Sequence, residues 1–265
     1  MTETNPLLIA LKSRIPGETF KLPSQGLFYT NGELSPDVVD GEVHVYPMAT
    51  HDDILMRTPD KLFTGQAIAE VFARCIPQIL KPMDLLAKDV DYLLVCLRIL
   101  TQGDSIALLF THSCENAKQH EYNVDQRPLL QTTRFIDPTI LQTMCTYEME
   151  SGQIVKLRPS LFKHMINVYQ SISLSKSQNG STVDEIEMKL LDVIAGMVVS
   201  VDDTTDPVLI KQWMDALPAG WLSKLAEHTT GIGDWGVNAS VKCICKDCNE
   251  EMTIEVPINP VGFFT

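Results

Sequence analysis

Three cysteines gathered in one short segment near the end of the chain restrict how that segment can fold. Residues 240–248 read Ser-Val-Lys-Cys-Ile-Cys-Lys-Asp-Cys, and β-type residues resume at Glu251–Val256. A hairpin turn with C-x-C-x-x-C spacing points several sulfur atoms at one centre, as a structural metal ion or a redox pair requires. We therefore predict two antiparallel strands joined by a cysteine knuckle, meaning a short turn that presents the thiols of Cys243, Cys245 and Cys248.

Zinc suits this knuckle best, because thiolates bind it firmly and the ion stabilises hairpins that are too small to bury a core. The three thiols leave one position open in a four-ligand site. We expect His228, at the end of the preceding helix, to fill it, and Asp247 is a poorer candidate. The expected cofactor is one structural zinc ion bound by Cys243, Cys245, Cys248 and His228. Unligated or oxidised thiols are the alternative.

An earlier segment repeats the order of strand, knuckle and strand. Residues 112–117 read His-Ser-Cys-Glu-Asn-Ala, and β-type runs flank them on both sides. Aligning this segment with the C-terminal one gives three pairs: His112 with Cys243, Cys114 with Cys245, and Ala117 with Cys248. His112, Cys114 and His120 could form a second metal site. The alanine in place of the last cysteine favours instead a degenerate internal repeat that binds no metal.

Elsewhere the sequence changes between helical and strand patterns. Residues 144–157 form a further hairpin around Ser151-Gly152. Apolar residues recur at helical spacing in the segments 58–77, 84–100, 161–172, 182–198, 206–217 and 218–231. These patterns predict an α+β fold. In it, helical segments accompany small antiparallel sheets and two zinc-ribbon-like strand-knuckle-strand units, of which the central one is degenerate.

The same patterns divide the chain into three parts. Residues 1–57, rich in proline and glycine, form an extended N-terminal arm or small sheet. Residues 58–158 contain a helical hairpin, the degenerate ribbon and the further hairpin. Residues 159–265 form a helical C-terminal half that ends in the cysteine ribbon and an extended aromatic tail.

Charge and motifs argue against several classes of function. The formal net charge of −13 repels nucleic-acid phosphates, and no basic run offsets it. No apolar run approaches the roughly 20 residues that span a bilayer. Acidic residues stand where a secretory signal would carry basic ones, so we expect a cytoplasmic protein. The G-x-G-x-x-G at 231–236 follows a helix and precedes a strand, the reverse of a dinucleotide-binding turn. Without a catalytic motif, we expect protein partners and no enzyme.

Aromatic residues near the end of the sequence are candidate contacts for such a partner. Phe263 and Phe264 follow prolines that keep the backbone extended, and they have little local core to enter. Trp235 is a third candidate, because aromatic side chains carry much of the energy of protein interfaces. We therefore expect an oligomer or a hetero-complex.

Several short motifs together resemble a known family. They are Leu22–Tyr29, Asp52-Asp53, Phe63–Ala67, the helix with Asp91–Leu94 leading to Arg98, the central knuckle, and the cysteine ribbon ending in Phe263-Phe264. In these motifs, which span most of the chain, the sequence resembles the baseplate hub and hub-assembly proteins of T-even-type contractile-tailed bacteriophages. It departs from the fuller pattern at Ala117, where one cysteine of a C-x-x-C pair is missing, which puts metal binding at the central knuckle in doubt.

The resemblance implies a structural or assembly protein of the tail baseplate, in its hub region, that acts through protein-protein contacts without catalysis. Its partners would be other baseplate or tail subunits. It would occur in the virion and, during assembly, in the host cytoplasm. A zinc-ribbon protein-binding or regulatory module is the alternative. A basic face beside the ribbon would favour that alternative, and the ribbon offers only Lys242 and Lys246.

Overall fold

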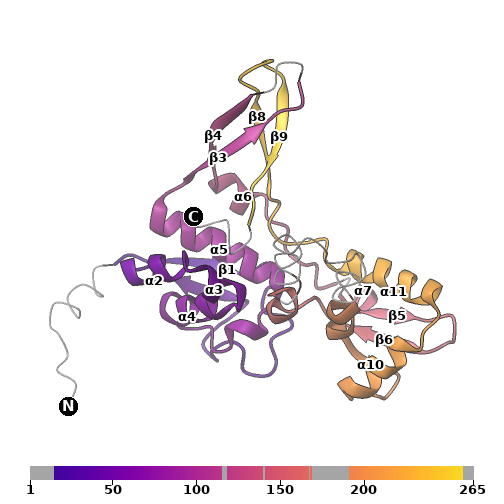
Figure 1. Ribbon diagram of the computed structural model, residues 1–265. Helices are drawn as coiled ribbons and strands as arrows, with labels where there is room; N and C mark the ends of the chain where they lie inside the picture. The colour runs from indigo at the N-terminus through magenta and orange to yellow at the C-terminus, as the bar shows by residue number, and fades with distance from the viewer. Residues whose placement is uncertain (1–14, 115–117, 140, 167, 169–190, 259–265) are drawn as a thin grey trace, which may run out of the picture.

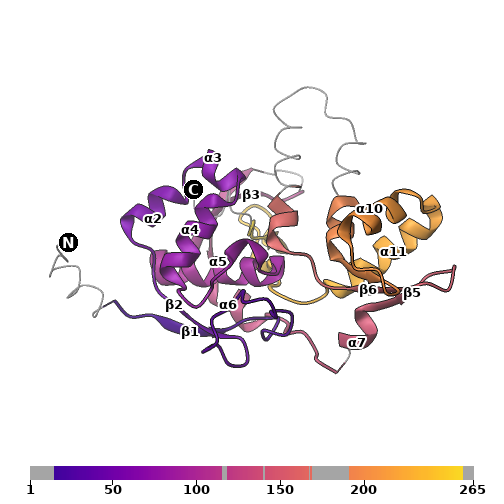
Figure 2. The same cartoon turned by 90° about the horizontal axis from the view of Figure 1, so that it is seen from below.

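The computed structural model describes residues 15–114, 118–139, 141–166, 168 and 191–258. Figure 1 shows two lobes that lie side by side and a double hairpin that projects from the first lobe, and Figure 2 shows the same separation of the lobes from below. Helices and small antiparallel sheets occur together, which confirms the predicted α+β class. No helix in the described part of the chain is long and apolar enough to cross a membrane.

The first lobe is built around helix α5 (Ala87–Gln102). Its middle, Tyr92–Leu97, is buried without a break, so neighbouring elements surround the helix on most sides. Strands β1 (Glu18–Lys21) and β2 (Glu42–Val45) pair antiparallel beside it. The remaining elements of this lobe are α2 (Thr50–Leu55), α3 (Pro59–Phe63), α4 (Gln66–Cys75), η1 (Pro82–Asp84) and α6 (Arg127–Gln131).

Two hairpins form the projecting part, which we call the double hairpin. Strand β3 (Ser105–Thr111) pairs antiparallel with β4 (Gln119–Asp125), and β8 (Ser240–Ile244) pairs antiparallel with β9 (Glu251–Glu255). Along each strand, exposed residues alternate with buried or half-buried ones. The buried sides belong to one hydrophobic core that continues into the first lobe. Because a single two-stranded hairpin is marginally stable in water, each hairpin gains stability from the other.

The second lobe combines a three-stranded antiparallel sheet with helices. The sheet has the strand order β5-β6-β7. A separate hydrophobic core, which includes Val155, Ile210 and Leu225, holds the lobe together. Its elements are α7 (Leu141–Met144), β5 (Thr146–Glu148), β6 (Ile154–Leu157), β7 (Val198–Val201), α10 (Pro207–Asp215) and α11 (Ala219–Ile232).

The hydrophobic cores do not follow the boundaries of the three parts predicted from the sequence. Cys245, Met252, Ile254 and Val256 belong to the core of the first lobe, although β7, α10 and α11 of the second lobe precede them in the sequence. The second core draws on β6 of the middle part and on α11 of the C-terminal part. The ribbon at the end of the chain therefore packs on the central ribbon and not on the helices that precede it.

Two predicted elements differ in detail from the observed ones. The single helix expected over 58–77 is two helices, because Gly65 has φ of 72° and a side chain there would touch Met83 and Ile166. Residues 198–201, expected in part as helix, form β7, in keeping with the preference of β-branched valine for strands. The segment 22–29 is a series of turns that follows β1. Of the helices expected at 161–172 and 182–198, residues 162–166 and 191–197 are helical, and residues 167, 169–172 and 182–190 lie outside the described residues.

A buried carboxylate anchors these turns to α5. Asp89, fully buried on α5, accepts hydrogen bonds from the Ser24 amide at 3.0 Å, the Ser24 hydroxyl at 2.5 Å and the Tyr29 hydroxyl at 2.6 Å. The Tyr29 hydroxyl in turn accepts from the Leu86 amide at 3.0 Å. Burial outweighs these hydrogen bonds and raises the pKa of Asp89 to about 6. The Leu-Pro-Ser-Gln-Gly-Leu-Phe-Tyr motif thus has a structural use in holding the N-terminal segment in place.

Candidate metal centre

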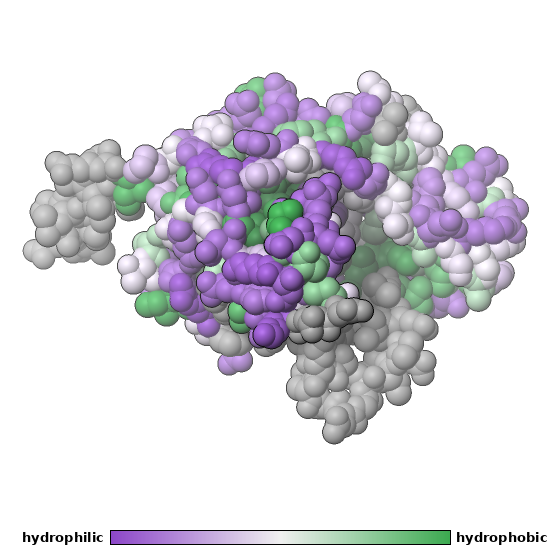
Figure 3. Space-filling view, turned by 90° about the horizontal axis from the view of Figure 1, so that it is seen from above, coloured by the Kyte–Doolittle hydropathy of each residue, from purple (hydrophilic) through white to green (hydrophobic). Residues whose placement is uncertain are grey.

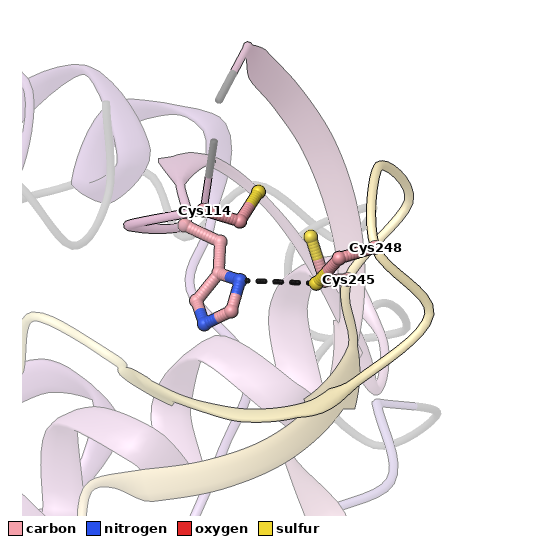
Figure 4. A group of neighbouring side chains, drawn as sticks. Cys114, Cys245 and Cys248 are labelled. Carbon is pink, nitrogen blue, oxygen red and sulfur yellow. Dashed lines mark hydrogen bonds between the residues drawn. The ribbon is translucent and has the colours of Figure 1, made fainter. Parts of the chain in front are cut away.

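The turns of the two hairpins meet and bring four metal-binding side chains together. His112 and Cys114 come from the turn between β3 and β4, and Cys245 and Cys248 come from the turn between β8 and β9. One nitrogen and three sulfur atoms of these residues all lie within 4.8 Å of one another. Figure 4 shows the thiols of Cys114, Cys245 and Cys248 close together on one side of an imidazole ring, with a dashed line from a ring nitrogen to one of the sulfur atoms. The group could hold a metal ion, because thiolate sulfur and imidazole nitrogen are the usual ligands of zinc and related ions.

The C-terminal turn is a tight knuckle held by its own backbone. The Cys245 amide donates to the Glu250 carbonyl at 2.9 Å, and the Asn249 amide donates to the Cys245 carbonyl at 3.0 Å. Asn249 closes the turn with φ of 59°, a left-handed conformation that asparagine tolerates better than most residues. The Asp247 amide points back at the Cys245 sulfur atom at 3.4 Å. The backbone therefore presents Cys245 as a sulfur that is already hydrogen-bonded.

These hydrogen bonds favour the thiolate form of Cys245. Donation from the backbone of Cys248, helped by that of Asp247, lowers the pKa of the Cys245 thiol to about 6. Desolvation raises the pKa of Cys114, and the neighbouring Cys245 sulfur raises it further. The cluster thus holds one thiol with a lowered pKa and one with a raised pKa. The Nδ1 atom of His112 lies 3.4 Å from the Cys248 sulfur. Thiolates are the form in which cysteines bind metal ions.

Side chains beside the ligands fasten one knuckle to the other hairpin. The Asp247 carboxylate accepts from the Lys118 amide at 3.1 Å and pairs with His120 Nε2 at 2.8 Å. Both contacts reach the start of β4, so Asp247 bridges the hairpins. The hydrogen bond with the His120 ring and the hydrogen bond from the Lys118 amide lower the pKa of Asp247. His120, predicted as a candidate ligand, is committed to this bridge instead.

Lys246 makes a second set of bridging contacts. Its amide donates to the Tyr122 hydroxyl at 3.1 Å, and its ammonium group donates to the Glu121 carbonyl at 2.7 Å. The same ammonium lies 5.1 Å from the centre of the Tyr122 ring, within reach of a cation-π interaction. The two residues between Cys245 and Cys248 therefore both hold the knuckle against β4, which fixes the four ligand atoms near one another.

The structure gathers two of the four residues predicted as zinc ligands and places the other two elsewhere. Cys245 and Cys248 belong to the cluster. Cys243 lies two residues earlier on β8, opposite Met252, where its side chain packs against the hydrophobic core. Two residues along a strand displace a side chain by roughly 6.6 Å, and Cys243 is not among the residues whose ligand atoms lie within 4.8 Å of one another. His228 is on α11 in the second lobe, where its Nε2 atom lies 3.0 Å from the Met144 carbonyl oxygen.

The aromatic residues predicted as partner contacts are also placed differently. Trp235 is only 5% exposed, packs with Leu86, Ile136 and Leu161, and donates from its indole nitrogen to the Ile232 carbonyl at 2.7 Å. It is therefore a core residue and has almost no surface to offer. Phe263 and Phe264 lie outside the described residues, as does Ala117 in the central knuckle.

Sequence reasoning named His112 and Cys114 as candidates for a separate, second metal site and did not place them with Cys245 and Cys248. The repeat of strand, knuckle and strand was a usable signal, since two similar hairpins can each supply two ligands to one ion. His112-x-Cys114 and Cys245-x-x-Cys248 are the two halves of such a set. Treating each knuckle as a separate site required the distant His228 as the fourth ligand of the C-terminal knuckle. It also made the central knuckle a degenerate repeat without metal.

The described structure is thus an α+β protein in which two hairpins meet at a composite Cys/His cluster. The sequence matches the T4 bacteriophage base plate protein family over residues 40–265. Because this match covers most of the chain, the protein belongs to that family, as the resemblance had indicated. Comparison with curated proteins and with solved structures gives no match.

Family membership carries a general conclusion about role. A T4-type phage baseplate protein has a structural role in the phage tail, which implies a location in the tail of the virion and interaction with other phage proteins. In addition, the side chains of the composite cluster could hold a metal ion.

Proposed function

We propose that the protein is a structural or assembly subunit of the hub region of a contractile-tail baseplate, and that it acts through protein-protein contacts without catalysis. The family match over residues 40–265 is the observation that carries this proposal. The resemblance of the Leu22–Tyr29 and Asp91–Leu94 motifs to hub proteins supports the hub assignment. In this role the chain would join other baseplate or tail subunits in the host cytoplasm during assembly, as an oligomer or a hetero-complex.

The placement of the unusual carboxyl groups supports a role without catalysis. Burial raises the pKa of Asp89 to about 6 and that of Asp91 to about 7, values that suit acid-base chemistry. Asp89, however, is fully buried beneath Ser24 and Tyr29 and is engaged by three hydrogen bonds. Neither carboxyl group lines the pocket beside Tyr147 and His228, the pocket beside Met214 and Leu222, or the pocket beside Phe28 and Leu157. These groups therefore fit the anchoring of a fold better than the binding of a substrate.

The surface supports contacts of a polar kind. Figure 3 shows mainly hydrophilic residues, with smaller hydrophobic areas between them, on the face seen from above. Non-obligate interfaces are about as apolar as the rest of a protein surface, so such a face can bind a partner. The net charge of −13 favours partner surfaces that are rich in lysine and arginine, and attraction of that kind weakens as salt is raised.

We assign to the metal centre a single structural zinc ion, which fits a protein that works by keeping its shape. A closed set of four protein ligands leaves no open position for a substrate or a reactive water molecule. We also retain Phe263 and Phe264 as candidate partner contacts. Deleting residues 260–265 should then abolish binding to the partner and leave the thermal unfolding of the free protein unchanged. A large drop in its melting temperature would make the tail part of the protein's own core.

Affinity purification from infected cells tests the proposed function. The tagged chain is recovered at low salt, and co-purifying proteins are identified and their ratios determined by native mass spectrometry. Tail or baseplate subunits in a fixed ratio would support the proposal, and their release at high salt would support contacts made through charge. Recovery of host proteins or nucleic acid in place of tail subunits would contradict it.

A zinc-ribbon protein-binding or regulatory module is the second candidate, which the four-ligand cluster between two hairpins favours. The same purification separates the two. A regulatory module would bring down a host protein through the double hairpin alone, whereas a baseplate subunit would bring down tail proteins in stoichiometric amounts. The few basic residues at the ribbon, Lys242 and Lys246, are paired with Glu251 and with the backbone of Glu121, which disfavours the alternative.

A further inference from the structure

We propose that His112, Cys114, Cys245 and Cys248 together bind one zinc ion, and that this ion fastens the C-terminal hairpin to the central hairpin. This inference adds detail to the proposed structural role. It depends on that role only for the purpose that the joined hairpins serve. The ligand set and its effect on folding are argued from geometry. His112 and Cys248 are 136 residues apart in sequence, so the ion would link opposite halves of the chain.

The spacing of the ligand atoms fits a tetrahedral zinc ion. Zinc-sulfur bonds of about 2.3 Å place two sulfur ligands about 3.8 Å apart in a tetrahedron, and a sulfur and a nitrogen ligand slightly closer. The observed limit of 4.8 Å among all four atoms is near these values, and the pair formed by His112 Nδ1 and Cys248 Sγ is already at 3.4 Å. Small side-chain rotations would bring the other atoms to bonding distance, without movement of the hairpins.

The surroundings prepare the site for an ion. The Asp247 and Lys246 contacts to β4 hold the two turns together independently of the ligands. Cys245 is fully buried and Cys114, Cys248 and His112 are half-buried, so the sulfur atoms are shielded from bulk water. Contacts of this kind, which orient ligands from outside the coordination sphere, typically change metal affinity by about 10- to 100-fold when they are lost.

Ion binding would stabilise the double hairpin in particular. Each hairpin has only two strands, and the strands of the C-terminal hairpin have five residues each. Short two-stranded hairpins bury little, and the free energy of metal binding then contributes directly to folding. Since the ligands come from both turns, the ion holds each hairpin only when the other is folded beside it. The C-terminal hairpin would therefore lock in place only once the central hairpin is folded beside it.

Metal analysis of ligand and control variants tests the ligand set. The full-length protein is purified under reducing conditions, without a metal-binding tag, and zinc per chain is measured by mass spectrometry of the digested protein. We expect about one zinc per chain in the wild type and nearly none in Cys114→Ser and Cys245→Ser. Cys243→Ser and His228→Gln are matched controls, because they change the same residue types outside the cluster, and should keep the ion.

Retention of zinc by Cys114→Ser together with its loss from Cys243→Ser would overturn the composite site in favour of a single-knuckle site. Absence of zinc from the reduced wild type would overturn it as well. Because a ligand variant can lose zinc by unfolding, the wild type loaded with cobalt gives a second readout. Its absorption spectrum should show tetrahedral cobalt with sulfur-to-metal charge transfer. A spectrum of octahedral cobalt without sulfur ligation would contradict the proposal.

Hydrogen exchange measures whether the ion stabilises the two hairpins against each other. Removing zinc from the full chain with a chelator should speed exchange of the amides in β3, β4, β8 and β9 by at least tenfold, and leave α10 and α11 unchanged. Equal exchange with and without zinc would show that the ion does not join the hairpins. These readouts need no partner. Zinc binding without recovery of tail proteins would therefore count against the proposed function alone, and recovery of tail proteins without zinc against the metal site alone.

Discussion

The substitution Asp89→Asn changes the buried anchor between α5 and the N-terminal turns, and its effect on stability should depend on pH. In the wild type, the Asp89 carboxylate accepts hydrogen bonds from the Ser24 amide, the Ser24 hydroxyl and the Tyr29 hydroxyl. Desolvation is the largest influence on this group and raises its pKa from 3.8 to about 6 in spite of those bonds. The side chain of asparagine is similar in shape but does not titrate.

The direction of the effect follows from the two pKa values. Because the pKa of Asp89 is higher in the folded protein, the folded state keeps a proton that the unfolded chain loses. The contribution of Asp89 to the free energy of unfolding therefore falls as pH rises from about 3.8 to about 6, and stays constant at higher pH. The whole fall is about 3 kcal/mol, and the part between pH 5 and pH 7 is about 1.3 kcal/mol.

Urea denaturation of the wild type and of Asp89→Asn, followed by circular dichroism at pH 5, 6, 7 and 8, measures this fall. We expect the wild-type advantage over the variant to shrink by about 1.3 kcal/mol between pH 5 and pH 7 and then to remain level. His164, whose pKa burial lowers to about 4, titrates in both proteins and largely cancels in the difference. Asp91 does not cancel in full, because the charge of Asp89 contributes to its raised pKa of about 7, so the two proteins are also compared in an Asp91→Asn background. A difference that is constant with pH would refute the reasoning.

Two further predictions concern stability at neutral pH, measured by the same denaturation. Gly41→Ala should destabilise the protein by more than 1 kcal/mol, because φ is 72° and the new methyl group would lie 2.6 Å from the Gln25 carbonyl carbon. Gly32→Ala is the matched control, because Gly32 has the same φ but open space around it. This substitution should cost only about 1 kcal/mol. Equal costs would refute the steric argument. Arg134→Ala should change stability by less than about 1 kcal/mol, since its ion pair with Asp234 is exposed to solvent; a larger loss would contradict this view of the pair.

Local patterns were sufficient to predict most elements of the fold. The apolar stripe over 84–100 predicted α5, and the Asp206-Pro207 start predicted α10, where Asp206 accepts from the Val208 amide at 2.8 Å. Both depend on residues within a few turns of one another. The break at Gly65 was not predicted, because an isolated glycine inside a helical pattern is often tolerated and its φ of 72° is not specified by the neighbouring residues.

The candidate metal site also depends on contacts between residues that are distant in sequence, which local patterns do not predict. Spacing within one turn identified Cys245 and Cys248, and the likeness of the two hairpins identified His112 and Cys114 as a related unit. Which knuckle faces which is decided by packing of the buried strand faces in a common core. The sequence does not contain that contact in any local pattern.

Electron microscopy of particles made in the absence of this chain tests the proposed baseplate role most directly. The encoding phage is grown with its gene interrupted early, and the lysate is compared with one in which the wild-type chain is supplied separately. We predict free heads and incomplete baseplate intermediates in the first lysate, and normal tails in the second. Complete baseplates in normal number without this chain would contradict a structural or assembly role in the baseplate.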